Sequence, residues 1–226
     1  QYGIIFATGN GGILMLIDKT VKDFVSQVAS SEPAPGGGSV SALVGSLGAA
    51  LTSMVGNLTV GRKAYNQLEE QYKHQIDENL TEVQKSIEKL NALVDEDTKA
   101  FSSFMKALKL PKETEEDKKV RTMSMEQATK EALEVPLNCA VECFNVLKLQ
   151  KVFALYGNQN AITDIGVGAL LAYSGLEGAL FNVKINLLSL KDKEYKNKIE
   201  EKIKKLLKEG KELKEELLDI VYKKLK

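Results

Sequence analysis

The sequence predicts an all-α protein: an antiparallel multi-helix bundle with one long central helix and a charged outer C-terminal helix. Three observations support this prediction. Apolar residues recur at steps of three and four along most of the chain, which is the period of a helix face. Only 4 of the 226 residues are proline, and no alternating pattern of useful strand length is present. A hydrophobic content of 43% is typical of a soluble domain with a buried core.

The composition and the start of the chain set the domain limits and exclude several partners. Lys plus Arg and Asp plus Glu both number 31, so no net charge attracts nucleic acid or an acidic membrane, and we expect neither as a partner. Residues 1–14 lack an initiator Met, whereas Met15 begins a charged segment. We therefore expect residues 1–14 to be an expression remnant or an upstream linker, and residues 15–226 to form one helical domain.

The first predicted helix begins after Thr20, whose hydroxyl suits a helix cap. Four apolar residues would share one face of it: Val21, Phe24, Val25 and Val28. It ends before Pro33, because the residue before a proline is driven out of helical geometry.

A second helix is expected from about Val40 to Thr59, with Ser39 as its cap. The segment between Glu32 and Arg62 contains no charged residue, but its prolines, glycines and hydroxyl residues fit a buried helix better than a membrane span. A row of small residues at every fourth position predicts close approach of another helix: Ser41, Gly45, Ala49 and Ser53. The apolar stripe comprises Val40, Leu43, Val44, Leu47, Leu51, Met54, Val55 and Leu58.

The remaining helices follow from the same periodicity. Pro136 would kink or restart a helix because proline lacks the backbone N–H, and Gly157 would end one. The charged last helix has a narrow apolar seam and would lie on the outside of the bundle. The expected spans are about 67–108, 116–135, 137–156, 164–190 and 193–225.

Asp97 breaks the pattern of the long central helix. The apolar positions from Ile76 to Leu108 follow one another in steps of four and three, and the only charged residue among them is Asp97. Burial raises the pKa of a carboxyl group toward the range useful for proton transfer. The alternatives are a solvated notch or an ion pair across the bundle. Asp95, two positions away, would point to nearly the opposite face, and we expect it to be solvated.

Several polar residues allow both a binding and a structural interpretation. The loop Gly36–Ser39 opens a helix and could receive an anion, or it could simply form a tight turn. Asn182 and Asn186 share one face of an apolar helix, where they would bond either a ligand or nearby backbone. The same ambiguity applies to a corner residue or cap and to basic residues that could hold carboxylates or be solvated: Asn158, Asp164, Arg62, Lys63 and Arg121.

The two cysteines predict neither a disulfide nor a metal site. Cys139 and Cys143 lie four residues apart on one helix face, where a disulfide is not readily formed. The only histidine, His74, is far away in the sequence. We expect buried thiols, no metal and a cytoplasmic location.

Taken together, these motifs resemble the formiminotetrahydrofolate cyclodeaminase family, which includes the C-terminal half of formiminotransferase-cyclodeaminase and methenyltetrahydrofolate cyclohydrolases. The similarity extends over nearly the whole chain from Met15. It rests on motifs in the family's order: 34–40, 54–56, 61–63, 94–97, 100–101, 135–137, 157–158, Asp164 and 182–187.

The resemblance implies a helical homodimer or higher assembly that binds folate, with no cofactor beyond the tetrahydrofolate substrate. The implied reaction is that of a lyase of one-carbon metabolism and histidine catabolism, which closes 5-formiminotetrahydrofolate to 5,10-methenyltetrahydrofolate and releases ammonia. Asp97 corresponds to the family's catalytic aspartate. We expect Gly36, Gly37, Gly38, Ser39, Asn182 and Asn186 to bind the pterin and bridging groups. Asn158 and Asp164 are further candidates for substrate binding.

The resemblance also implies partners and rival activities. Arg62, Lys63 or Arg121 would hold the glutamate tail of a polyglutamylated substrate, and a formiminotransferase is a possible partner. The alternatives are a methenyltetrahydrofolate cyclohydrolase and a non-catalytic helical scaffold whose charged last helix binds another protein.

Overall fold

The structure is a computed structural model that describes residues 15–190 and 192–226. Within these ranges it contains seven α-helices, two 3₁₀ turns and no strand, which confirms the all-α prediction. The expectation for residues 1–14 lies outside the described residues. The helices are α1 (Val21–Val28), α2 (Gly37–Thr59), α3 (Lys63–Asn66), α4 (Glu70–Leu108), α5 (Glu115–Tyr156), α6 (Ile162–Leu187) and α7 (Lys193–Lys224), with 3₁₀ turns at Leu16–Asp18 and Gln159–Ala161.

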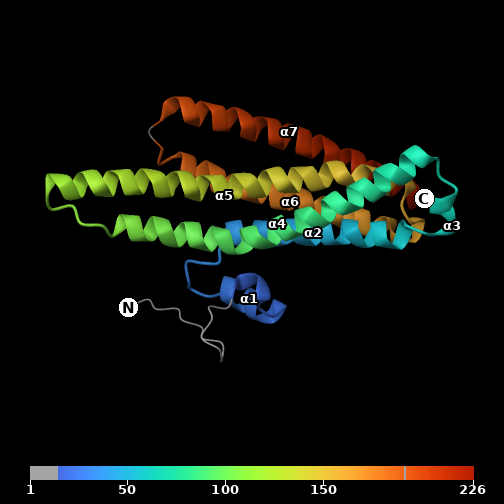
Figure 1. The fold of residues 1–226 in the computed structure, drawn as a ribbon, viewed down its shortest axis with the longest axis horizontal. Coiled ribbons are helices and arrows are strands. Elements are labelled where there is room, and N and C mark those ends of the chain that lie inside the picture. Colours follow the sequence, from blue (N-terminus) through green and yellow to red (C-terminus); the bar gives the residue numbers. More distant parts are fainter. Residues whose placement is uncertain (1–14, 191) are drawn as a thin grey trace.

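Four long helices form an up-and-down bundle. Its main contacts join α2 with α4 and α6, and α5 with α4 and α6. α7 packs outside on α5 and α6, as expected for a charged outer helix. α4 and α5 extend beyond α2 and α6 at one end of the bundle, and α1 lies beside the bundle near that end (Figure 1). The chain enters α2 close to this overhang, and α6 ends there.

α2 buries its row of small residues, which confirms the expected close approach of another helix, but its apolar stripe is less buried than expected. All four residues of the small row are buried, whereas Val55 is the one buried residue of the apolar stripe and Leu47 is 50% exposed. A Cβ on Gly48 would lie 2.8 Å from the carbonyl oxygen of Gly168 in α6, so the two backbones meet directly. Close backbone contact thus determines which face is buried. By length and hydropathy α2 could span a membrane, but 61% of its most apolar window is buried inside the protein.

α5 is continuous through Pro136, which is a correction to the two expected helices. Pro136 lies inside α5 and is buried. The helix begins with a capping box in which Thr114 and Asp117 exchange hydrogen bonds. The next section shows what replaces the hydrogen bond that the proline cannot donate.

α1 is capped by Thr20 as predicted, because its hydroxyl accepts from the Asp23 N–H at 3.1 Å. The prediction of a buried face is wrong for most of its residues. Only Phe24 is buried, while Val21 is 83% and Val25 59% exposed. Of this eight-residue helix, Phe24 alone joins the hydrophobic core.

Candidate active site

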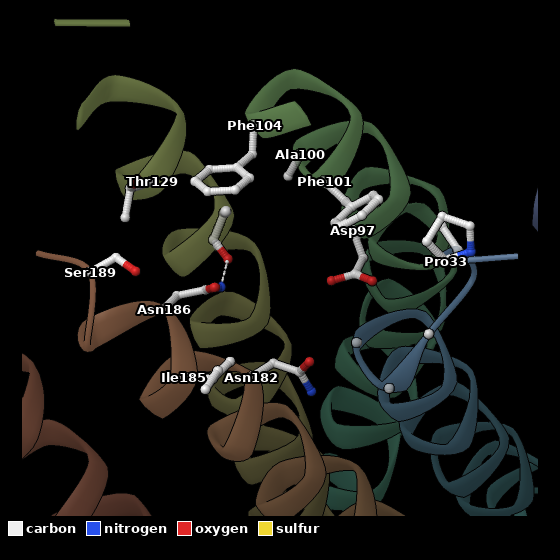
Figure 2. A pocket seen from close by; sticks show the side chains of 15 residues that line it. Pro33, Asp97, Ala100, Phe101, Phe104, Thr129, Asn182, Ile185, Asn186 and Ser189 are labelled. Carbon is white, nitrogen blue, oxygen red and sulfur yellow. Dashed lines mark hydrogen bonds between the residues drawn. The ribbon is translucent and has the colours of Figure 1, made fainter. Parts of the chain in front are cut away.

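A cavity of about 330 Å³ lies at the start of α2 and the end of α6, beside the parts of α4 and α5 that continue past them. Figure 2 shows the carboxyl group of Asp97 and the amide of Asn182 directed into this space from opposite walls. We call it the Asp97 cavity. It is lined by Pro33, Ala34, Gly36, Gly37, Gly38, Asp97, Ala100, Phe101, Phe104, Thr129, Ala132, Asn182, Ile185, Asn186 and Ser189.

Asp97 is held in place by Ser39 at the start of α2. The backbone N–H of Ser39 donates to Asp97 Oδ2 at 3.0 Å. The Ser39 hydroxyl lies 3.2 Å from the same oxygen but only 2.7 Å from the Val94 carbonyl oxygen. A hydroxyl has one proton to donate, so the shorter contact to Val94 takes it and the backbone amide remains as the constant donor to Asp97. Ser39 therefore positions the carboxylate and does not cap α2 with its side chain.

Partial burial raises the pKa of Asp97, and the hydrogen bond from the Ser39 backbone N–H opposes this rise. Within the described part of the chain, no Lys or Arg forms a salt bridge with this carboxylate. The alternative of an ion pair across the bundle is thus not realised in one copy of the chain. The carboxyl group faces the cavity with a proton affinity greater than that of an ordinary surface aspartate.

Of the loop glycines, Gly38 is the one at which any added side chain would collide with the Asp97 carboxyl group. A Cβ at Gly38 would lie 2.6 Å from Asp97 Oδ2 and closer still to Oδ1 and Cγ, which is far inside van der Waals contact. A Cβ at Gly37 would be 3.4 Å from the Asn182 amide nitrogen, an ordinary distance. The glycine run therefore lets the start of α2 approach the carboxyl group of α4 directly.

Asn186 serves the fold as well as lining the cavity. In a regular helix the N–H of residue 136 would donate to the carbonyl of Ala132, but Pro136 has no N–H. Asn186 Nδ2 of α6 donates to this Ala132 carbonyl oxygen at 2.6 Å (Figure 2). The amide thus supplies the missing hydrogen bond, keeps α5 continuous and ties it to α6. For Asn186, the structural alternative described above is realised.

Asn182 is arranged differently. Its Nδ2 donates to the Gly178 carbonyl oxygen one turn earlier in α6, at 3.0 Å. Among the described residues nothing donates to the other end of this amide, so its oxygen is available as an acceptor for a donor in the cavity. Asn182 therefore faces Asp97 as a polar group that a ligand can contact.

Asp95 is buried, which corrects the expectation that it is solvated. Its side chain accepts from the backbone N–H of Leu16 at 2.6 Å and of Ile17 at 3.3 Å, and the residue is 6% exposed. The prediction that it points away from Asp97 holds. The expectation of solvation failed because the chain before α1 folds back over this side of α4, which no local pattern in α4 reveals.

Four predicted binding residues gather at the opposite end of α2. Arg62 and Lys63 follow it directly, and Asn158 donates to the Leu58 carbonyl oxygen at 3.1 Å. Asp164 lies in the first turn of α6. We call these four residues the far-end cluster. The 23 residues of α2 separate it from the Asp97 cavity by about 35 Å, so one copy of the chain does not bring the two groups together.

Arg121 also lies outside the lining of the cavity. Its Nη2 donates to the Leu108 carbonyl oxygen at 3.2 Å, across the connection from α4 to α5. Its Nε is buried with no hydrogen-bond partner among the described residues. In this position Arg121 satisfies the last turn of α4.

The sequence interpretation missed several lining residues. Phe101 and Phe104 were assigned to the buried seam of α4, yet Phe101 is 36% exposed and borders the cavity. The available signal was their position one turn and two turns after Asp97 on the same face. Thr129 carried no signal, because a single threonine in a charged helix segment is unremarkable in sequence; its hydroxyl donates to the Met125 carbonyl oxygen at 2.7 Å.

Comparison with known proteins is consistent with this geometry. The family model of formiminotransferase-cyclodeaminase matches residues 20–205. A methenyltetrahydrofolate cyclohydrolase of Methylorubrum extorquens is 38% identical over 92% of this chain and 98% of its own length. The formimidoyltransferase-cyclodeaminase of Gallus gallus is 39% identical over 87% of this chain, which spans only 36% of that relative.

A solved structure has the same fold. The crystal structure of formiminotetrahydrofolate cyclodeaminase from Thermotoga maritima superposes with a TM-score of 0.73 at 28% identity, covering 92% of this chain and 96% of its own. Sequence and structure thus agree over nearly the full domain, and the chain belongs to the formiminotransferase-cyclodeaminase family.

Proposed function

We propose that this protein is a folate enzyme that converts 5-formiminotetrahydrofolate into 5,10-methenyltetrahydrofolate and ammonia. The observation that carries the proposal is the carboxyl group of Asp97, which faces the Asp97 cavity. The pKa of this group is raised, and Ser39 holds it in position. The named relatives are all enzymes of folate one-carbon chemistry, which supports the substrate class.

The reaction requires one proton to move between two nitrogens. N10 attacks the carbon of the protonated formimino group, and the ionised Asp97 accepts the N10 proton as the N10–carbon bond forms. The protonated Asp97 then donates that proton to the amino group on the same carbon. The carbon–nitrogen bond breaks, ammonia leaves, and the methenyl cation remains with Asp97 ionised again. A carboxyl group with a raised pKa suits both steps, and such transfer contributes typically 10²–10⁴-fold.

The walls of the cavity support the geometry of ring closure. Attack by N10 needs the formimino carbon held within reach, which is a problem of orientation. Phe101 and Phe104 provide apolar surface, and the Asn182 oxygen can accept from an N–H of the pterin. The product is a cation, which the ionised carboxylate of Asp97 stabilises.

A second candidate reaction is hydrolysis of 5,10-methenyltetrahydrofolate, because the relative covered over 98% of its length is named methenyltetrahydrofolate cyclohydrolase. Here water would add to the methenyl carbon with loss of a proton to Asp97. The N5–carbon bond would then break as a proton reaches N5, which gives 10-formyltetrahydrofolate and one released proton. The same carboxyl group would serve both reactions.

We further infer that the enzyme is a homodimer in which α2 and α6 pair with their copies in antiparallel orientation. The outer face of these helices exposes apolar residues that the bundle leaves uncovered, with Leu47 50%, Leu170 48% and Phe181 62% exposed. An antiparallel pair would carry the far-end cluster of one copy toward the Asp97 cavity of the other. Arg62, Lys63, Asn158 and Asp164 would then complete the polar contacts of the site.

The test is absorbance at the methenyltetrahydrofolate band with the purified protein. Wild type mixed with 5-formiminotetrahydrofolate should produce the band, and the Asp97→Asn variant should produce it far more slowly. Loss of the band from added methenyltetrahydrofolate would instead identify the hydrolase. If wild type changes neither substrate, the folate assignment is wrong and the scaffold alternative takes its place.

A further inference from the structure

The hydroxyl of Ser39 contacts side chains that belong to two different cavities. Asp97 lines the Asp97 cavity, and Thr98 lines a second cavity of about 760 Å³, which we call the Thr98 cavity. Ser39 itself is 0% exposed and lines neither of them. Its Oγ lies 3.2 Å from Asp97 Oδ2 and 3.4 Å from Thr98 Oγ1. A buried hydroxyl therefore links the carboxyl group of one cavity to the hydroxyl of the other.

The two cavities differ in their access to water once a substrate is bound. The Asp97 cavity, at about 330 Å³, has the size of a pocket that covers most of its ligand. A substrate in it separates the Asp97 carboxyl group from bulk water. The Thr98 cavity is larger, and residues of α4 that line it are exposed: Lys99, Ser102 and Lys106. Thr98 therefore keeps access to solvent while Asp97 is covered.

The Thr98 hydroxyl is arranged differently from those of the other threonines in α4 and α5. Those hydroxyls each donate to the carbonyl oxygen four residues earlier in the same helix: Thr81, Thr122 and Thr129. Among the described residues, the only hydrogen-bond partner of Thr98 Oγ1 is Ser39 Oγ, and either oxygen can be the donor. The Thr98 hydroxyl is thus free to accept one proton and donate another.

The two candidate reactions differ in whether a proton must leave the site. Closure of the protonated formimino group returns the proton of N10 to the departing ammonia, so no proton is exported. Hydrolysis of 5,10-methenyltetrahydrofolate releases one proton per turnover, which Asp97 takes up first. While substrate or product covers the Asp97 cavity, that proton needs a second route to water.

We propose that the hydroxyls of Ser39 and Thr98 relay this proton from Asp97 to water in the Thr98 cavity. The inference rests on the proposed function, through its hydrolytic reaction. Asp97 Oδ2 gives its proton to Ser39 Oγ, the Ser39 proton passes to Thr98 Oγ1, and the Thr98 proton passes to water. Each hydroxyl loses one O–H bond and gains another, so one proton crosses and both hydroxyls end neutral.

The hydrogen bonds around Ser39 allow this transfer. Contacts of 3.2 and 3.4 Å are longer than the roughly 2.5–3.0 Å of a full O–H···O bond, and catalytic hydrogen bonds commonly tighten when the substrate binds. Before transfer, the Ser39 hydroxyl donates to the Val94 carbonyl oxygen at 2.7 Å. In a regular helix the N–H of residue 98 donates to the same carbonyl. The Val94 carbonyl therefore keeps a donor when the Ser39 hydroxyl turns toward Thr98.

The test compares the rates of methenyltetrahydrofolate hydrolysis and of formiminotetrahydrofolate deamination, measured by absorbance on the whole protein in dilute buffer. Thr98→Val removes the hydroxyl and keeps the shape of the side chain. The hydrolysis rate should fall by at least about tenfold, and by less than the roughly 10²–10⁴-fold contributed by proton transfer, because Asp97 remains. The deamination rate should fall much less. Thr98→Ser restores a hydroxyl and should restore hydrolysis.

A small proton acceptor separates a relay from a structural effect. Imidazole at increasing concentration should raise the hydrolysis rate of Thr98→Val, because it accepts the proton in place of the missing hydroxyl, and should change the wild-type rate little. A damaged fold would not recover in this way. The matched control is Thr81→Val, which removes an exposed hydroxyl from the same helix and should leave both rates unchanged.

Three outcomes would overturn the inference. Hydrolysis by Thr98→Val at the wild-type rate would show that the proton leaves by another route. A loss in Thr98→Val that imidazole does not reverse would assign Thr98 to the fold. Deamination without hydrolysis in wild type would leave no proton to export, so the relay would be wrong while the proposed function stands. If wild type turns over neither substrate, the proposed function itself fails, and the relay fails with it.

Discussion

The two faces of α4 around residue 96 present two carboxylates in opposite situations. Asp95 is buried under the segment before α1, and both of its oxygens accept backbone N–H groups. Asp97 is partly buried beside α2, accepts one backbone N–H from Ser39, and faces the Asp97 cavity. The first carboxylate is satisfied by the fold, whereas the second is incompletely satisfied. Asp97 is therefore the aspartate whose carboxylate can still bind a ligand or exchange a proton.

The largest effect that this comparison predicts is on catalysis. Asp97→Asn keeps the shape of the side chain but cannot take up and return a proton, so kcat should fall by about 10²–10⁴-fold. The melting temperature should stay the same or rise, because the variant removes a carboxylate that burial disfavours. The measurement is initial rate at the methenyl band together with thermal unfolding. Retention of full activity would show that Asp97 is a tolerated polar residue.

The second prediction moves Asp97 without changing it. Gly38→Ala places a methyl group where the Asp97 carboxyl lies, so either the carboxyl group or the start of α2 must shift. A displacement near 1 Å can cost about 100-fold in rate. The control is Gly37→Ala, whose added methyl would meet Asn182 only at 3.4 Å. Equal rates for the two variants would contradict the role given to Gly38.

The third prediction concerns the satisfied aspartate. Asp95→Ala leaves the backbone N–H groups of Leu16 and Ile17 without their acceptor, which should lower the free energy of unfolding by about 1–3 kcal/mol. Chemical denaturation measures this value. The rate should change much less than in Asp97→Asn. A rate loss as large as that of Asp97→Asn, in a folded protein, would remove the distinction between the two faces.

A fourth prediction applies the same contrast to the two asparagines of α6. Asn186→Ala removes the donor to the Ala132 carbonyl and should lower the free energy of unfolding by about 1–2 kcal/mol. Introducing Pro136→Ala restores a backbone N–H at the position that needs it, so the second substitution should reduce the cost of the first. A double-mutant cycle gives this coupling. Additive effects would mean that Asn186 does not replace the missing bond.

The smallest expected effect is on the pH profile. The pKa of Asp97 is raised, so the rate should fall on the acid side at a higher pH than for an ordinary aspartate. Ser39→Gly keeps the backbone donor and should shift this limb only slightly. The effect on stability has the opposite direction. Because the folded state holds the Asp97 proton more tightly than the unfolded chain does, this group stabilises the fold as pH falls through the pKa range of Asp97, and this contribution is lost as pH rises. An acid limb at the pKa of a surface aspartate would contradict the assignment.

Local pattern was sufficient to predict most of the helices and to single out Asp97 as the charged position in the apolar seam of α4, because both depend on spacing within one segment. It predicted the close approach of another helix at the small row of α2, but not that most of the apolar stripe of α2 would stay outside the core, since that depends on which helices pack around it. It missed the burial of Asp95, because this burial depends on the segment before α1 lying against α4. The continuity of α5 through Pro136 required a side chain from α6, fifty residues later in the chain.

The glycine contacts between α2 and α6 have a mechanical consequence. Gly48, Gly168 and Gly175 allow the two backbones to lie against each other with no flexible side chain between them, so the Gly36–Ser39 loop and Asn182 are mounted on one stiff unit. Phe101 and Phe104 belong instead to the last two turns of α4, and α4 extends beyond this pair (Figure 1). One wall of the site thus lies on the closely packed α2–α6 pair, and the other lies on the end of α4, which this pair does not support. Substrate closure, seen by hydrogen exchange, would slow exchange mainly in the second half of α4 and the start of α5.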